Sequence, residues 1–254
     1  MTRGAIVVGA SSGIGAALAR TLSERGYEVG LAARRTDRLA ELGGELPTQA
    51  YVSTMDVAEP ETAREAFFEL AAAMDRVELV VLSAGVGSVN HDLEWEPERE
   101  TIQVNVSGFT AIATAAIEYF ERRASASAGL DSSARSLDGH LVGISSVASH
   151  VGDPDTPAYN ASKAFVTRYL EGLRHRQATR SADVAVTTVE PGYVDTGMAM
   201  SDDPFWMSSP ETAASQIARA IEKRRSHVYV TRRWRLVSWL VRALPEPIVR
   251  RLLS

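Results

Sequence analysis

The stretch at residues 5–18 constrains the fold more than any other part of the chain. It begins with Ala5 to Val8, a continuous apolar run rich in β-branched residues, as is typical of a parallel strand buried on both faces. Ile14, Leu18 and Leu22 then recur every fourth residue, which predicts a helix. Three glycines lie at the junction, so the sequence predicts a strand, a glycine-bearing turn and a helix.

Each glycine of this turn has a physical reason to be there. Gly9 allows the tight turn, Gly13 lets the backbone approach a phosphate, and Gly15 lets the helix pack against the strand. The free N–H groups of the first helical turn then face an anion. The spacing G-x-x-x-G-x-G differs from the common G-x-G-x-x-G, so a purely structural turn is the alternative. The position between a buried strand and a helix favours the pyrophosphate of a nucleotide.

The composition narrows the class of protein. The chain has 254 residues, of which 45% are hydrophobic and 23% charged, as in an ordinary globular protein with a sizeable core. The net charge of −5 leaves no basic surplus to neutralise phosphates, which argues against nucleic-acid binding. The absence of cysteine excludes disulfides, a thiolate zinc site and a cysteine nucleophile, and it agrees with a reducing cytoplasm.

Membrane and metal signals are also missing from the sequence. We find neither a signal peptide nor a run of about 18 uncharged apolar residues that could span a bilayer. The histidines are scattered without the spacing of metal ligands, so no metal site is expected. These histidines are His91, His140, His150, His175 and His227. We therefore expect a cytoplasmic protein without a transmembrane span.

Strand-like and helix-like segments alternate along the chain. We expect strands at 5–8, 27–34, 51–57, 78–83, 141–145, 184–189 and 228–230, and helices from 14 on, at 37–46, from 60 on, and at 97–123, 157–176 and 210–224. Seven strands separated by helices give a doubly wound parallel sheet with helices on both faces. No linker separates two such sheets, so we expect one domain over residues 1–231.

Two irregular segments interrupt this pattern. Residues 124–138 are rich in Ala and Ser and lack periodicity, which predicts a surface loop insertion without catalytic consequence. Residues 193–209 contain turn formers but also several large apolar residues, and a loop this long and apolar usually covers something. Those residues are Met198, Met200, Phe205, Trp206 and Met207. We expect this second segment to cover the substrate.

Five residues in three parts of the chain carry candidate chemistry. Tyr159 and Lys163 are i and i+4 neighbours on one helix, where an ammonium lowers the pKa of a phenol and makes it a usable general acid/base. Ser145 and Ser146 end a predicted strand, at the edge where open sheets bind ligands. Asn105 is a polar residue on the inward face of the helix at 97–123, which needs a specific partner. The expected inward residues of that helix are Ile102, Phe109, Ile112, Ala116 and Phe120.

Six ordered motifs resemble those of the short-chain dehydrogenase/reductase family, in its NADP(H)-preferring type. They are Gly9 to Gly15, Ser83 to Gly85, Asn105 to Gly108, Ile144 to Ser146, Tyr159 to Lys163 and Pro191-Gly192. The match runs from residue 5 to about 197. The resemblance implies a single-domain Rossmann fold and an NAD(P)-dependent oxidoreductase. Two motifs depart from the family at Val8, usually threonine, and Ser83, usually asparagine, which puts local rigidity in doubt more than chemistry.

The resemblance also implies roles for the candidate catalytic residues. Tyr159 would give the proton to the substrate oxygen, and Lys163 would lower its pKa and hold the nicotinamide ribose. The family places its substrate-binding serine thirteen residues before the tyrosine, which selects Ser146 over Ser145. Asn105 would hold a water that links Lys163 to solvent.

The same resemblance supplies a set of cofactor-binding residues. Besides Tyr159 and Lys163, these are Gly9, Ser11, Ser12, Gly13, Ile14 and Gly15 at the phosphates and ribose, Asp56 and Val57 at the adenine, and Ala84, Gly85, Pro191, Gly192, Val194 and Thr196 toward the nicotinamide. A carboxylate after the second strand would select NAD, whereas Arg34 and Arg35 stand there. We therefore predict NADP(H); the alternative is NAD(H), with an arginine stacked on the adenine.

Substrate and partners depend on segments outside the motifs. In this family Val86 to Trp95, Val151 to Thr156 and the loop 193–207 would line the pocket, and their Met and Trp residues suggest an apolar or aromatic carbonyl compound or secondary alcohol. The leading hypothesis is an NADP(H)-dependent oxidoreductase with Tyr159 as general acid/base. The alternative is an NADP(H)-binding regulatory protein of the same fold without turnover.

The C-terminal residues 232–254 are amphipathic and rich in arginine and tryptophan, which predicts a helical extension. Such a helix could lie on an anionic membrane surface. We favour packing against the domain or another subunit, since the family often forms homodimers and homotetramers.

Overall fold

The protein is built on a single seven-stranded sheet in the order β3-β2-β1-β4-β5-β6-β7, with every neighbouring pair parallel. The computed structural model describes residues 3–127, 138–196 and 206–253. The strands are β1 (Arg3–Val8), β2 (Tyr27–Ala33), β3 (Ala50–Thr54), β4 (Val77–Leu82), β5 (Gly139–Ile144), β6 (Val184–Pro191) and β7 (His227–Val230). The predicted doubly wound sheet is confirmed.

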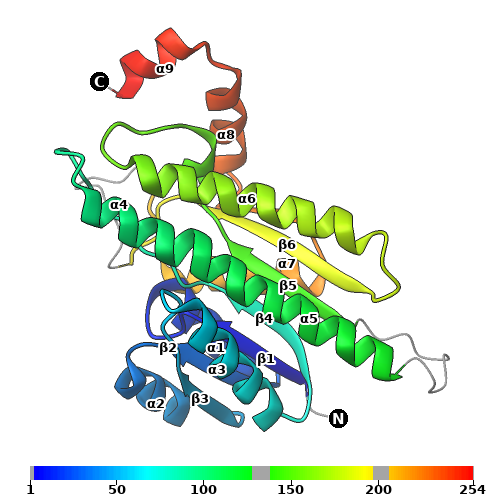
Figure 1. Ribbon diagram of the computed structural model, residues 1–254. Helices are drawn as coiled ribbons and strands as arrows, with labels where there is room; N and C mark the ends of the chain where they lie inside the picture. The colour runs from blue at the N-terminus through cyan, green and yellow to red at the C-terminus, as the bar shows by residue number, and fades with distance from the viewer. Residues whose placement is uncertain (1–2, 128–137, 197–205, 254) are drawn as a thin grey trace.

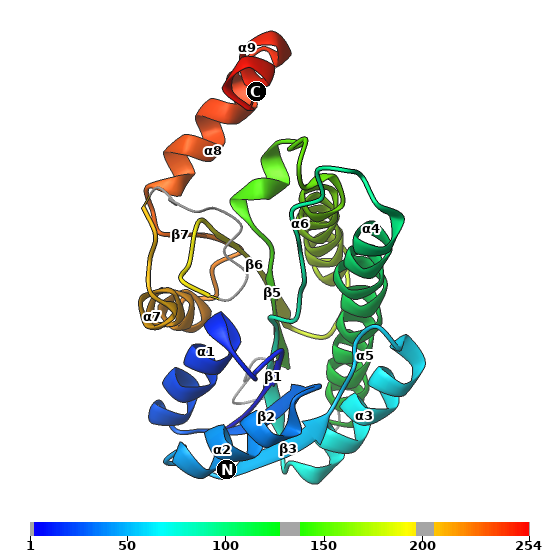
Figure 2. The same cartoon turned by 90° about the vertical axis from the view of Figure 1, so that its left-hand side faces the viewer.

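Helices cover both faces of the sheet (Figures 1 and 2). They are α1 (Gly13–Glu24), α2 (Thr36–Glu45), α3 (Pro60–Ala73), α4 (Trp95–Ile102), the π-helix η1 (Gln103–Gly108), α5 (Phe109–Ser127), the 3-10 turn η2 (Val147–His150), α6 (Pro157–Gln177), α7 (Pro210–Glu222), α8 (Trp234–Ala243) and α9 (Glu246–Leu253). The helices α3, α5 and α6 pack on one face, and α1, α2 and α7 pack on the other.

Two apolar cores follow from the alternation of side chains along the strands. In β1, Ile6 and Val8 join the core under α3, α5 and α6, whereas Ala5 and Val7 join the core under α1, α2 and α7. Full burial of one large apolar side chain contributes about 1.5–3 kcal/mol, so the two cores together hold the sheet between its helical layers.

The long helix expected at 97–123 is interrupted, which corrects one prediction. The π-helix η1 inserts a wider turn between α4 and α5 and shifts the phase of the inward face. Ile102, expected to face inward, is therefore 44% exposed, while Thr101 and Asn105 are buried. Beyond η1 the expected inward residues are buried, from Phe109 to Phe120.

The sheet has its topological switch point at β1, because the chain leaves β1 for β2 on one side and later returns to β4 on the other. In such sheets ligands bind at the carboxyl ends of the strands beside this point. The third strand ends at Thr54, earlier than expected, so Asp56 and Val57 lie in the loop at this edge. The predicted insertion at 124–138 lies mostly outside the described residues, as do Met198, Met200 and Phe205 of the loop at 193–209.

Candidate active site

The glycine turn between β1 and α1 is closely packed on all sides. Gly9 has a φ of +89°, and a Cβ there would lie 2.4 Å from the Ala84 nitrogen. A Cβ at Gly15 would lie 2.2 Å from the Gly9 oxygen, so the helix does pack against the turn as predicted. Gly13 has a φ of +55°, and its Cβ would lie 2.9 Å from Cγ2 of Thr196. The turn therefore meets both the end of β4 and the loop after β6.

The main chain braces this turn at the two positions that depart from the motifs. The N–H groups of Ser83 and Ala84 both donate to the Val8 oxygen, at 2.8 and 2.9 Å. These bonds need no side chain at Val8 or Ser83. The joint between β1 and β4 is thus tied through backbone groups.

The start of α1 offers unsatisfied donors to an anion. Its N-cap residue, Ser12, makes no side-chain capping bond to the helix, and no acidic residue lies in the first turn. The Ser12 hydroxyl instead accepts a hydrogen bond from Arg35 at 2.7 Å, and Ser11 accepts another at 2.9 Å. A helix N-terminus with free N–H groups, a glycine turn and a nearby guanidinium fits a phosphate group. The residues present therefore fit the pyrophosphate of a dinucleotide.

The two arginines after β2 differ in their surroundings. Arg35 lies over the glycine turn through its bonds to Ser11 and Ser12. Arg34 is exposed, and no side chain among the described residues binds it. Asp56 accepts a hydrogen bond from the Ala58 nitrogen at 3.0 Å, and Val57 is buried. The predicted adenine-side residues thus follow β2 and β3 at one edge of the sheet.

Asn105 lies at the centre of the π-helix and is 1% exposed. Its Oδ1 accepts from the Val86 nitrogen at 2.9 Å, and its Nδ2 donates to the Val86 oxygen at 2.8 Å and to the Ser162 hydroxyl at 2.9 Å. The side chain therefore ties the loop after β4 to α6. Only the second lone pair of Oδ1 stays free in this set of bonds for the predicted water.

Lys163 and Asn105 both approach Gly85, on the side where a side chain at that position would lie. A Cβ at Gly85 would lie 3.3 Å from both the Asn105 Oδ1 and the Lys163 Nζ. Lys163 is 5% exposed, and its ammonium donates to the Ile144 oxygen at 3.2 Å. Burial lowers the pKa of Lys163 to about 8. This lysine can therefore exchange a proton near neutral pH.

The two serines after β5 have different partners. The Ser145 hydroxyl donates to the Lys163 main-chain oxygen at 2.8 Å and lies 2.8 Å from the Thr167 hydroxyl, so it is fully used in packing β5 on α6. Ser146 caps η2 by accepting from the Ala148 nitrogen at 3.1 Å, and its hydroxyl adjoins the Tyr159 phenol and lowers the pKa of that group. Of the two serine hydroxyls, that of Ser146 is the one that acts on the Tyr159 phenol.

The pKa of Tyr159 is raised, whereas the sequence predicted that Lys163 would lower it. Burial raises the pKa of this phenol, while the adjoining Ser146 hydroxyl lowers it and the neighbouring Tyr193 raises it, so the net shift is upward. The Lys163 Nζ lies 5.6 Å from the centre of the Tyr159 ring and donates to Ile144 instead. Lys163 therefore does not lower the pKa of Tyr159 in this arrangement, and burial sets the direction of the shift.

The loop after β6 packs under the C-terminal helix. Pro191 is buried, and a Cβ at Gly192 would lie 1.9 Å from Nε1 of Trp234 in α8. Val194 forms a bridge with Ser208, which joins the two described ends of the loop at 193–209. Thr196 lies against Gly13. Of the residues predicted toward the nicotinamide, Thr196 and Ala84 therefore adjoin the glycine turn.

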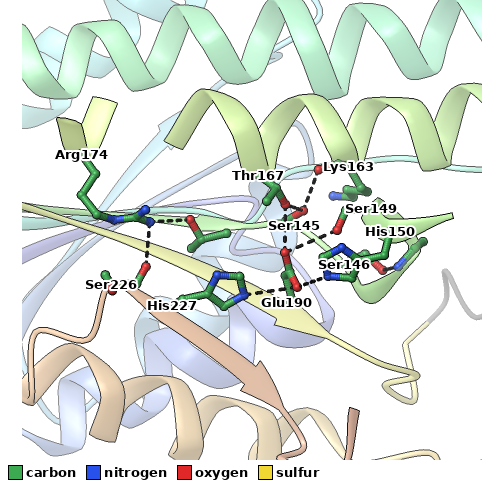
Figure 3. A network of polar contacts seen from close by, with 12 residues as sticks. Ser145, Ser146, Ser149, His150, Lys163, Thr167, Arg174, Glu190, Ser226 and His227 are labelled. Atoms are coloured by element: carbon green, nitrogen blue, oxygen red, sulfur yellow. Dashed lines mark hydrogen bonds and ion pairs between the residues drawn. The ribbon is translucent and has the colours of Figure 1, made fainter. Parts of the chain in front are cut away.

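A buried carboxylate behind the site was missed from the sequence (Figure 3). Glu190 is 0% exposed and accepts from His150 at 2.7 Å, from His227 at 3.2 Å and from Thr167 at 3.1 Å. Burial alone would raise the pKa of Glu190, but the hydrogen bonds from the two histidines outweigh it and bring it to about 2. The available signal was a single charged residue near the end of a strand that carries no other charge.

The segments expected to line the substrate pocket lie at the same edge of the sheet. The Asn90 nitrogen donates to the Asp155 oxygen at 2.7 Å, which joins 86–95 to 151–156. Several large apolar side chains in these segments and around the loop at 193–209 are exposed: Val89, Leu93, Trp95, Tyr193, Trp206 and Met207. The described residues contain no cluster of metal-binding side chains.

The chain is similar to known proteins in both sequence and fold. The family described as short chain dehydrogenase matches residues 3–205. An uncharacterized oxidoreductase of Mycobacterium tuberculosis is 33% identical over 97% of this chain and 95% of its own, and one of Myxococcus xanthus is 32% identical over 97% and 94%. The alcohol dehydrogenase of Thermococcus sibiricus, solved with 5-hydroxy-NADP, is 25% identical with a TM-score of 0.73, over 90% of this chain and 94% of its own.

Proposed function

Because the chain belongs to the short-chain dehydrogenase family of oxidoreductases, we propose that it is an NADP(H)-dependent enzyme that interconverts a carbonyl compound and a secondary alcohol. The observation that carries the proposal is the grouping of three polar side chains at one edge of the sheet: the Lys163 Nζ lies 5.6 Å from the centre of the Tyr159 ring, and the Ser146 hydroxyl adjoins the phenol and lowers its pKa. Bound NADP(H) supplies the hydride. The chain's own residues place the substrate oxygen and move the proton.

The proposed chemistry uses the phenol of Tyr159 as the acid in reduction and as the base in oxidation. Ser146 donates a hydrogen bond to the substrate oxygen and holds it within reach of the phenol. The raised pKa of Tyr159 keeps the phenol protonated, as an acid requires. After transfer, Lys163 stabilises the phenolate and returns a proton, which its pKa of about 8 permits near neutral pH.

The NADP(H) preference rests on the absence of a carboxylate after β2 and on two arginines in its place. Arg35 already lies over the phosphate end of α1, and Arg34 is exposed beside it. The Thermococcus sibiricus relative was solved with an NADP derivative. NAD(H) stays the alternative, which a fluorescence titration with NADPH and NADH in one buffer distinguishes.

The proposed substrate is an apolar or aromatic carbonyl compound or secondary alcohol. The support is the set of exposed apolar side chains around the carboxyl edge of the sheet, among them Trp95, Tyr193 and Trp206. We also propose that the protein acts in the cytoplasm as a homodimer or homotetramer. Screening of carbonyl substrates with NADPH as donor tests the substrate class.

The deciding experiment replaces Tyr159→Phe, which removes only the phenolic oxygen. We expect NADPH binding to persist and kcat to fall by about 10²–10⁴-fold, the usual contribution of a general acid. Tyr51→Phe is the matched control, since that phenol bonds to Glu28 on β2, far from the site in the sheet order. Retained turnover in the Tyr159 variant would contradict the mechanism. Binding of NADPH without turnover of any carbonyl compound by the wild type would favour the regulatory alternative.

A further inference from the structure

Helix α8 has a buried face that packs on the domain and, opposite it, an exposed apolar face. Trp234 and Ser238, one turn apart, are 7% and 3% exposed. On the other side Leu236, Trp239 and Leu240 follow the i, i+3, i+4 spacing and are 73%, 72% and 53% exposed. An aromatic and two leucine side chains thus form a stripe that no described residue covers.

Figures 1 and 2 show the position of the helix that bears this stripe. The helices α8 and α9 extend from one end of the sheet beyond the helical layers, with α9 at the far tip. In α9, Ile248 is 47% exposed and Arg250 and Arg251 are also exposed. The extension therefore presents apolar and basic side chains away from the body of the protein.

The charge of the chain is divided sharply at Glu222. Residues 223–254 contain nine basic residues and a single acidic one, Glu246, whereas residues 1–222 contain 18 basic and 31 acidic residues. A protein of net charge −5 thus carries a strongly cationic C-terminal segment on an anionic body. A negatively charged surface would attract this segment and repel the rest, which would orient the molecule.

Basic side chains also line the space where the extension leaves the domain. An open cleft of about 1440 Å³ lies between α7, β7 and the start of α8. Its cationic lining residues are Arg219, Lys223, Arg225, Arg232, Arg233 and Arg235, with Glu211 as its acidic one. None of these cations is paired with a carboxylate of the described residues. Arg233 lies instead over the Trp206 ring, at 5.6 Å.

We propose that the α8–α9 extension is a docking surface for an anionic lipid bilayer. The stripe of Leu236, Trp239 and Leu240 enters the boundary between headgroups and acyl chains, and the flanking arginines bind the anionic headgroups. A basic amphipathic helix with tryptophan on its apolar face suits this position. No helix among the described residues is long and apolar enough to cross a bilayer, so the contact is peripheral.

The charge favours a bilayer over a second copy of the chain as the occupant of this surface. A twofold symmetric dimer would place the same patch on both subunits, so the arginines around α8 would face one another. Like charges across an interface are destabilising. An anionic membrane pairs the same arginines with phosphate and carboxylate groups and buries the apolar stripe at once.

The test is co-sedimentation of the full-length protein with vesicles of phosphatidylcholine alone and of phosphatidylcholine with 30% phosphatidylserine. We expect binding to the anionic vesicles, weakening as salt is raised. The double variant Arg232→Gln/Arg235→Gln should bind about 30-fold more weakly, from about 1 kcal/mol per basic residue. The variant Trp239→Ser/Leu240→Ser should also lose binding, while its thermal unfolding stays unchanged because both side chains are exposed.

The matched control is Arg122→Gln/Arg168→Gln. Both side chains are 72% exposed and lie on α5 and α6, away from the extension, so the same charge change should leave vesicle binding intact. Equal losses in the two arginine variants would overturn the proposal, as would a wild-type protein that stays in the supernatant. A dimer in sedimentation equilibrium that the Trp239/Leu240 variant dissociates would assign the stripe to a second copy instead.

Discussion

The indole of Trp234 fills the space that a side chain at position 192 would take, since a Cβ at Gly192 would lie 1.9 Å from its Nε1. Trp234 also makes an edge contact with Tyr193 at 5.7 Å between ring centres. The first residue of α8 is thus packed directly on the loop that follows β6. Any change at this contact reaches both the candidate cofactor site and the C-terminal extension.

We expect Gly192→Ala to destabilise the protein by about 1–3 kcal/mol, the usual effect of overpacking. The added methyl must displace the indole, which is 7% exposed and has little room to move. The free energy of unfolding in urea measures the change. Gly152→Ala is the control, because a Cβ there meets nothing within 4 Å. Equal unfolding free energies for the two variants would contradict the close contact.

The buried Glu190 should dominate the acid stability of the protein. Its folded pKa is about 2, below the ordinary value of 4.5, so its contribution is present above about pH 4.5 and is lost as the pH falls toward 2. We expect Glu190→Gln to lower the free energy of unfolding at pH 7 by about 3 kcal/mol, since it leaves the histidine donors poorly matched. Urea unfolding at pH 7 and pH 3 measures the free energy of unfolding of both proteins, and the difference between wild type and variant should be smaller at pH 3. The same difference in unfolding free energy at both pH values would contradict a stabilising role of the Glu190 charge.

His140 should act in a separate pH window. Burial, and secondarily the charge of Arg224, lower its pKa from 6.5 to about 4, and its ring lies 2.7 Å from the Thr187 hydroxyl. The folded state therefore resists protonation, so stability is full above pH 6.5 and falls between pH 6.5 and 4. The loss amounts to about 3 kcal/mol. His140→Gln, which does not titrate, should flatten the unfolding free energy between pH 7 and 4.5. An unchanged slope in that variant would assign the acid sensitivity to other groups.

The sequence predicted the sheet and much of the site for local reasons. The glycines of the first turn are constrained by contacts within one strand–turn–helix unit, and Ser146 and Tyr159 are fixed by strand and helix ends that the pattern marks. The exposed Ile102 was not predictable, because a 3.6-residue period cannot encode the wider turn of η1. The pKa direction of Tyr159 depends on burial, which a helix spacing does not contain.

The Glu190 cluster was hidden for a different reason. Its partners come from η2, α6 and β7, which are far apart in the chain and meet only after the sheet has formed. His150 and His227 come from η2 and β7, so no short sequence spacing marks them as partners of one carboxylate. Long-range convergence of this kind leaves no periodic trace in the sequence.

The two arginines after β2 permit a test of cofactor preference at a single exposed position. Arg34 is bound by no described side chain, so its replacement should leave the fold intact, whereas Arg35 is tied to Ser11 and Ser12. A hydrogen bond to a charged group contributes about 1.5–3 kcal/mol, or roughly 10–100-fold in affinity. We expect Arg34→Asp to weaken NADPH binding by about that factor and to narrow the gap to NADH, because a carboxylate suits the ribose 2′-hydroxyl and repels a 2′-phosphate. Fluorescence titration with both nucleotides measures the ratio of the two dissociation constants.

The control is Arg38→Asp, which makes the same charge change at an exposed residue of α2 and should alter this ratio little. If both variants keep the wild-type ratio, Arg34 has no part in the preference and the choice rests with Arg35 or with another contact at the adenine end.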